Sequence, residues 1–108
     1  MAIIRACSYN CSIKTPQAPS EYSAILVSFS QDQNTLINKA LSDGDGGLDT
    51  TADAVQVHLS QEDTALFEAP GVTYMQIRCY KSTYDAPGSK LFQIPVIPAL
   101  NDEILGGT

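Results

Sequence analysis

The sequence predicts an all-β protein, an immunoglobulin-like β-sandwich of six or seven antiparallel strands with one short helical turn near residues 61–66. Residues 55–59 and 72–80 carry an apolar side chain at every second position, the period of a strand with one buried and one wet face. Other short apolar runs follow at nearly regular spacing between turn residues, without an internal repeat. A small barrel is the alternative. Because the paired cysteines and the tryptophan of antibody domains are missing, only the architecture is predicted.

The chain of 108 residues is expected to form one β-sandwich domain over residues 1–108, since 44% of its residues are hydrophobic and only 17% are charged. The first part, residues 1–21, is expected to hold one strand at 2–7 and then an irregular connection at 8–21, which is rich in Ser, Thr and Pro. At the other end, residues 101–108 are expected to form a loose tail.

A strong strand is expected at residues 22–29, where the second face is also nearly apolar, which favours a place in the middle of a sheet. Residues 30–34 have the Asn and Asp content of a hairpin turn, so that 35–41 can return as the antiparallel partner. A short helix is the alternative for 35–41, but an uncapped helix of that length is marginal on its own.

An acidic, glycine-rich loop is expected at residues 42–47, after which 48–53 leads into a strand at 54–59. The segment Asp43–Asp49 is similar to a calcium loop, because carboxylates on a flexible backbone can surround a hard cation. The ligand register of an EF-hand is not kept, however, so a solvated loop is favoured over a calcium site.

The pair Ser60 and Asp63 has the spacing of a capping box, in which each side chain accepts a hydrogen bond from the other residue's backbone N–H. This predicts a helical turn at 61–66 that carries the chain from one sheet to the other. Either Leu66 or Phe67 would then close the end of the core.

A strand is expected at 72–80, followed by a Pro and Gly turn at 84–89 and a returning strand at 90–97. Pro95 has no N–H for a sheet ladder, so this part of the strand should lie at an edge or direct the missing donor away from a neighbour.

The net charge of -6 argues against nucleic acid as a partner, because the chain repels phosphate overall. An anionic membrane surface is disfavoured as a partner because the basic residues are scattered: Arg5, Lys14, Lys39, Arg78, Lys81 and Lys90. No apolar run reaches the length of a signal-peptide core or a membrane span, so export by the general pathway is not expected.

Three cysteines, Cys7, Cys11 and Cys79, lack the spacing of a metal site, and one histidine cannot complete a zinc shell with them. Cys7 and Cys11 could pair, but reduced thiols in a cytosol are favoured, with Cys79 as a small inward hydrophobe. No metal and no cofactor are expected.

No set of nucleophile, base and electrophilic stabiliser can be found in the sequence, so the protein is not expected to be an enzyme. His58 should face away from the apolar side of its strand, as a surface or interface residue without a catalytic partner. Glu62 and Asp63 adjoin a helix start, where capping explains them better than acid catalysis does.

The outward face of the strand at 72–80 carries Tyr74, Gln76, Arg78 and Tyr80. Tyr and Arg are enriched in protein interfaces, so these four residues are the candidate interaction site. A loop of the same chain could cover this face instead, and a glycan-binding platform of Tyr side chains is a less favoured alternative.

Three segments, residues 30–32, 59–67 and 75–78, resemble small uncharacterised β-sandwich proteins encoded in tailed bacteriophages and prophages of Gram-positive gut bacteria. The resemblance covers about residues 22–105 and is closest at these positions: Ser60, Gln61, Glu62, Thr64 and Phe67. It implies a virion-associated structural or assembly protein of the head, tail or baseplate. Such a protein would be made in the bacterial cytoplasm, would bind other virion proteins and would form homo-oligomers. A glycan-binding module displayed on a tail is the alternative.

Overall fold

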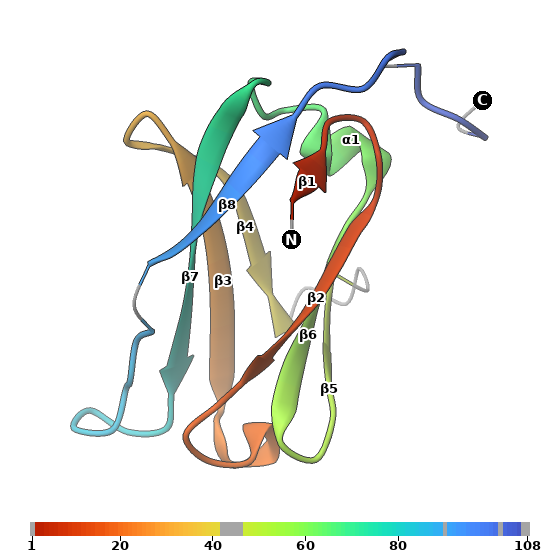
Figure 1. The fold of residues 1–108 in the computed structure, drawn as a ribbon. Coiled ribbons are helices and arrows are strands. Elements are labelled where there is room, and N and C mark those ends of the chain that lie inside the picture. Colours follow the sequence, from red (N-terminus) through yellow and green to blue (C-terminus); the bar gives the residue numbers. More distant parts are fainter. Residues whose placement is uncertain (1, 42–46, 90, 102, 107–108) are drawn as a thin grey trace.

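The computed structural model describes residues 2–41, 47–89, 91–101 and 103–106, and these residues form two packed β-sheets (Figure 1). The first sheet has five strands in the order β1-β8-β7-β3-β4, and the second has three in the order β2-β6-β5. The strands are β1 (Ile3–Ile4), β2 (Tyr9–Lys14), β3 (Ala24–Gln31), β4 (Asn34–Ala40), β5 (Leu48–Thr50), β6 (Ala54–Leu59), β7 (Gly71–Tyr80) and β8 (Phe92–Ile97). A 3-10 turn spans Pro19–Glu21 and one helical turn, α1, spans Gln61–Thr64.

The core lies between the two sheets and is formed by alternate residues of each long strand. In β7 the buried residues are Thr73, Met75, Ile77 and Cys79, and in β6 they include Val55, Val57 and Leu59. The alternation predicted for these two strands is therefore confirmed. Strand β3 lies between β7 and β4, in agreement with its predicted place in mid-sheet.

Strands β3 and β4 form the predicted antiparallel hairpin, and the helical alternative for this segment is wrong. Strand β3 begins and ends two residues later than expected and runs to Gln31, so the turn is confined to Asp32 and Gln33. Both turn residues have positive φ, 50° and 67°, as in the tight turn whose twist matches that of paired strands.

The capping box at α1 is confirmed. Asp63 N–H donates to Ser60 Oγ at 3.1 Å, and Ser60 N–H donates to Asp63 Oδ2 at 2.9 Å. The helical turn joins β6 of one sheet to β7 of the other, as expected. Of the two residues expected to close the end of the core, Phe67 is buried and Leu66 is 57% exposed. The ring centroids of Phe67 and Phe29 are 6.0 Å apart.

Three features of the N-terminal half differ from the sequence-based expectations. The segment 8–21, expected to be irregular, contains strand β2, which pairs along its whole length with β6. The segment 48–53, expected to lead into a strand, contains the short strand β5. The first strand covers only Ile3–Ile4 and pairs in parallel with β8, so the sheets are not wholly antiparallel.

Candidate functional site: the outer face of the five-stranded sheet

The four candidate residues of β7 lie in one row on the outer face of the five-stranded sheet. The β3–β7 register places Ser30 beside Tyr74 and Ser28 beside Gln76. It continues with Leu26 beside Arg78 and Ala24 beside Tyr80. Because directly paired residues of neighbouring strands point to the same face, the two strands present a continuous surface of small, polar and aromatic side chains.

Exposed apolar side chains also lie on other strands of this face. The side chains of Tyr74 and Tyr80 are 41% and 46% exposed, which leaves two aromatic rings open to solvent. Further large apolar residues exposed on the outward sides of their strands are Ile4, Leu36 and Ile97. Large apolar side chains are therefore exposed on four of the five strands of this sheet, with small and polar side chains between them.

Arg78 is the only charged side chain that the described strand residues direct to this face. Lys39 of β4 pairs with the inward residue Val27 and turns to the inner side, where its Nζ lies 3.1 Å from Asp63 Oδ2. No described strand residue directs a carboxylate to the outer face, in a chain with a net charge of -6. A surface that is poor in charged residues but carries Tyr and Arg has the composition of an interface core.

A loop of the same chain lies beside this face and not across its exposed rings. Segment 87–89 continues the sheet next to β7, since Cys79 N–H donates to Pro87 O and Ser89 N–H donates to Ile77 O, both at 2.9 Å. The Gln76 side chain donates to Ser89 O at 3.0 Å, which fixes its amide. The alternative that a loop covers this face therefore applies to Gln76, which is half-buried, whereas Tyr74, Arg78 and Tyr80 stay exposed.

A shallow hollow of about 200 Å³ lies at one end of the row, between Leu26, Arg78, Tyr80 and Ala86. Its described lining includes one guanidinium, one phenol and the buried Cys79, but no carboxylate. These groups can bind a partner by stacking and hydrogen bonding, but they do not supply a nucleophile with a base.

His58 lies on the opposite side of the molecule, on the outer face of the three-stranded sheet. Its Nδ1 is 2.6 Å from Asn10 Oδ1 and its Nε2 is 3.0 Å from Asp49 Oδ2. The partner Asp49 could not be inferred from the sequence, because β5 was not expected to be a strand. The hydrogen bonds of the His58 ring therefore reach one carboxylate and one amide, and neither of these groups is a hydroxyl or thiol that a base could activate.

Metal binding gains no support from the described residues, which contain no group of three or more His, Cys, Asp or Glu side chains placed to hold an ion. Most of the loop that is similar to a calcium site, residues 43–46, lies outside the described residues. The three cysteines are free. Burial raises the pKa of the Cys11 and Cys79 thiols, which disfavours the reactive thiolate at both positions.

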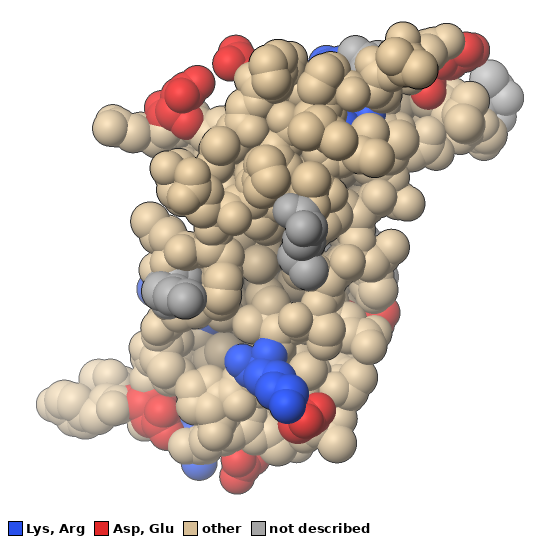
Figure 2. All heavy atoms as spheres, in the orientation of Figure 1, with Lys and Arg blue, Asp and Glu red and all other residues tan. Residues whose placement is uncertain are grey.

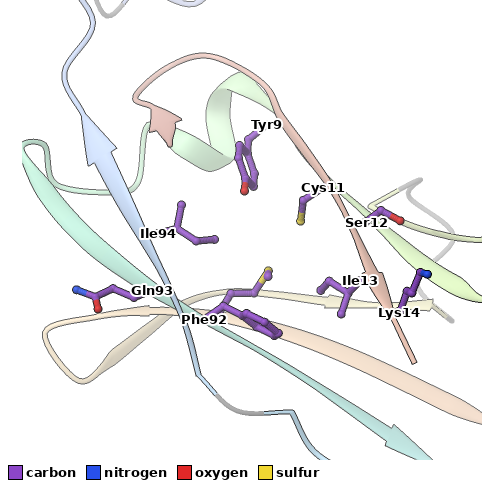
Figure 3. Close-up of a pocket in the computed structure, with 9 residues that line it drawn as sticks. Tyr9, Cys11, Ser12, Ile13, Lys14, Phe92, Gln93 and Ile94 are labelled. Atoms are coloured by element: carbon purple, nitrogen blue, oxygen red, sulfur yellow. The ribbon is translucent and has the colours of Figure 1, made fainter. Parts of the chain in front are cut away.

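A hollow of about 390 Å³ lies between the sheets where β2 faces β8 (Figure 3). Tyr9, Cys11 and Ile13 of β2 point into it from one side, and Phe92 and Ile94 of β8 lie on the other. Burial, with a further effect of the neighbouring Cys11, raises the pKa of Tyr9 to about 12. This hollow could not be predicted from the sequence, because residues 9–14 were expected to be irregular and not a strand.

Comparison with solved structures agrees with the architecture. The chain is similar to the immunoglobulin-like domain of mouse leukocyte-associated immunoglobulin-like receptor 1, crystallised as a strand-swapped dimer, with 11% identity and a TM-score of 0.51 over 90% of this chain and 86% of that chain. The V domain of amphioxus IgVJ-C2 aligns over 91% of this chain and 98% of its own length, with 8% identity and a TM-score of 0.43. No protein-family model and no curated protein sequence matches the chain.

The class that the fold defines is therefore the immunoglobulin-like β-sandwich, as the sequence predicted. At 11% identity the likeness extends to the fold alone. Among the described residues no helix is both long and apolar enough to cross a lipid bilayer.

Proposed function

We propose that the protein is a non-enzymatic structural or assembly component of a phage particle, which acts by protein–protein association through the outer face of its five-stranded sheet. The observation that carries the proposal is the exposed row Tyr74, Arg78 and Tyr80, on a face where the described strand residues offer no carboxylate. Exposed aromatic and Arg side chains are the groups that contribute most to binding energy when a partner covers them.

The partners proposed are further copies of this chain and other virion proteins, and the proposed location is the virion. Charge supports this choice over nucleic acid, because a chain with six basic and twelve acidic residues gains little by neutralising phosphate. The resemblance of residues 59–67 and 75–78 to phage proteins supports the virion as the setting.

Multi-angle light scattering over a range of concentrations, alone and with the proteins of the parent phage, tests this function. We expect association that falls at least roughly tenfold in affinity for Tyr74→Ala and for Arg78→Ala, since central Tyr and Arg truncations often cost about 2 kcal/mol or more. Tyr84→Ala is the control, because Tyr84 is fully exposed in the connection after β7. A strict monomer that joins no virion protein would refute the proposal.

A glycan-binding module is the second candidate, favoured by the shallow hollow in which Tyr80 adjoins Arg78. An array of host surface glycans separates the two functions. Saturable binding that Tyr80→Ala abolishes, while the protein stays monomeric, would favour the glycan module. Silence on the array together with association in solution would favour the assembly protein.

A further inference from the structure

Each sheet has two edges, and three of the four edges carry a feature that opposes the addition of another strand. Strand β1 has only two residues and β5 has only three. Strand β4 is longer, but its register with β3 shifts between Phe29 and Ser30, and it directs Lys39 to the inner side. Short edges, bulges and inward charges are devices that keep sheet edges from pairing with other chains.

Strand β2 has none of these protections. It has six residues in unbroken register with β6, without proline, bulge or inward charge, and β6 is its only strand partner among the described residues. Alternate residues of an edge strand direct N–H and C=O groups away from the sheet, where another strand can bind them.

The hollow of about 390 Å³ lies directly inside this edge (Figure 3). It is lined by Tyr9, Cys11 and Ile13 of β2 and by Ile94 of β8. Strand β1 covers β8 only at Val96 and Ile97, so it does not extend over this part of β8. A strand added beside β2 would both satisfy the free backbone groups and place apolar side chains over the hollow.

We propose that this added strand is β2 of a second copy, paired antiparallel about a two-fold axis at Cys11. Opposite residues of an antiparallel pair share a face, so inward residues must meet inward residues. With Cys11 opposite the partner's Cys11, Tyr9 meets the partner's Ile13, and Asn10 meets the partner's Ser12. The two three-stranded sheets then join into one continuous sheet across an isologous interface.

Charge favours a second copy at this position. The chain is acidic overall, but the six residues of β2 contain no carboxylate and only one charged residue, Lys14 at the end. In the proposed register Lys14 meets the partner's Ser8 and not another lysine. Figure 2, viewed from the side on which β2 and β8 lie, shows Asp and Glu mainly toward the two ends of the body. Two acidic copies can therefore meet along β2 without opposing carboxylates.

Paired charge variants test the register by sedimentation equilibrium. Asn10→Lys with Ser12→Lys places lysines opposite the partner's lysines, and Asn10→Asp with Ser12→Asp does the same with carboxylates. Like charges directly opposite destabilise a strand pair, so we expect each variant alone to dimerise roughly tenfold more weakly than the parent chain. An equimolar mixture of the two variants should dimerise again, because lysines then lie opposite carboxylates. Thr50→Lys, at the opposite edge of the same sheet, is the control and should dimerise as the parent does.

Oxidation by diamide supplies a second readout. In a Cys7→Ser chain, diamide takes up the two hydrogens of two Cys11 thiols, and a disulfide-linked dimer is expected that is absent from Cys7→Ser with Cys11→Ser. A parent chain that stays monomeric, or charge variants that associate as the parent does and do not recover in the mixture, would overturn the proposal. The proposed function is tested apart from this dimer by association beyond it, with further copies or with virion proteins, which Tyr74→Ala should weaken while the β2 dimer stays intact.

Discussion

The side-chain amide of Gln31 holds the backbone of Glu68 through both of its polar atoms. Its Nε2 donates to Glu68 O at 3.1 Å, and its Oε1 accepts from Glu68 N–H at 2.8 Å. Gln31 is 6% exposed, at the end of β3, and Glu68 lies just before β7. One side chain therefore satisfies both backbone polar groups of Glu68, which lies in the connection between α1 and β7.

Gln31→Glu should destabilise the fold. The carboxylate keeps the acceptor for Glu68 N–H but places a second oxygen against Glu68 O, so a buried donor is lost and a charge is partly buried. We expect a loss of about 1–3 kcal/mol in the free energy of unfolding, measured by urea denaturation. Gln33→Glu, exposed in the adjoining turn, makes the same change of charge and should be nearly neutral. Equal losses for the two variants would contradict the pairing.

Gly71→Ala should also be destabilising, because β7 begins close to the same connection. A Cβ at Gly71 would lie 2.8 Å from Glu68 O and 3.3 Å from Gln31 Nε2, so backbone must move. We expect a loss of about 1–3 kcal/mol, as for other overpacked sites. At Gly88 the nearest atom would be Arg78 Cγ at an ordinary 3.7 Å. Thermal unfolding should therefore show a lower Tm for Gly71→Ala than for Gly88→Ala.

The two faces of β7 can be told apart with one substitution at adjacent positions. Ile77 is 5% exposed in the core, so Ile77→Asp buries an unpaired carboxylate and should prevent folding, at a cost of several kcal/mol or more. Gln76→Asp changes the outer face and loses one hydrogen bond to Ser89 O, at about 1 kcal/mol. Circular dichroism and the yield of soluble protein show which of the two variants folds. Similar behaviour of the two variants would mean that the faces are wrongly assigned.

The free energy of unfolding should decrease as pH rises from 10.0 to about 12, partly because of Tyr9. Burial raises the pKa of Tyr9 to about 12 from 10.0, so between these values the unfolded chain loses this proton while the folded chain keeps it. The contribution is fully present below pH 10 and is lost as pH rises toward 12. Tyr9→Phe should lose less stability over this range. It should be at least as stable at pH 7, because the Tyr9 hydroxyl is buried without a hydrogen bond among the described residues. An identical slope of unfolding free energy against pH in both proteins would contradict this role.

Strands β6 and β7 and the cap of α1 could be predicted from the sequence because their signals are local. Alternation shows directly when one face of a strand is buried, and the Ser60 and Asp63 side chains bind backbone groups only three residues away. Strand β2 has the same alternation, with Tyr9, Cys11 and Ile13 on the inward side. It was missed because the many Ser, Thr and Pro residues of segment 8–21 favoured an irregular connection over this short signal.

The candidate site was predictable only in part. The row on β7 follows from the period of a single strand. The other exposed apolar residues of this face, Ile4, Leu36 and Ile97, come from β1, β4 and β8, and their place on the same face depends on strand order, which local patterns do not encode. The free edge of β2 likewise depends on which strands pair and which do not.

Hydroxyl-radical footprinting of the three exposed tyrosines, in the free chain and in the assembled state, tests the proposed association surface most directly. Tyr74 and Tyr80 lie on the outer face, whereas Tyr84 lies in the connection after β7 and serves as the reference within the same molecule. The account predicts that oxidation of Tyr74 and Tyr80 falls on assembly while that of Tyr84 does not change. Unchanged oxidation of Tyr74 and Tyr80 in a fully assembled sample would contradict it.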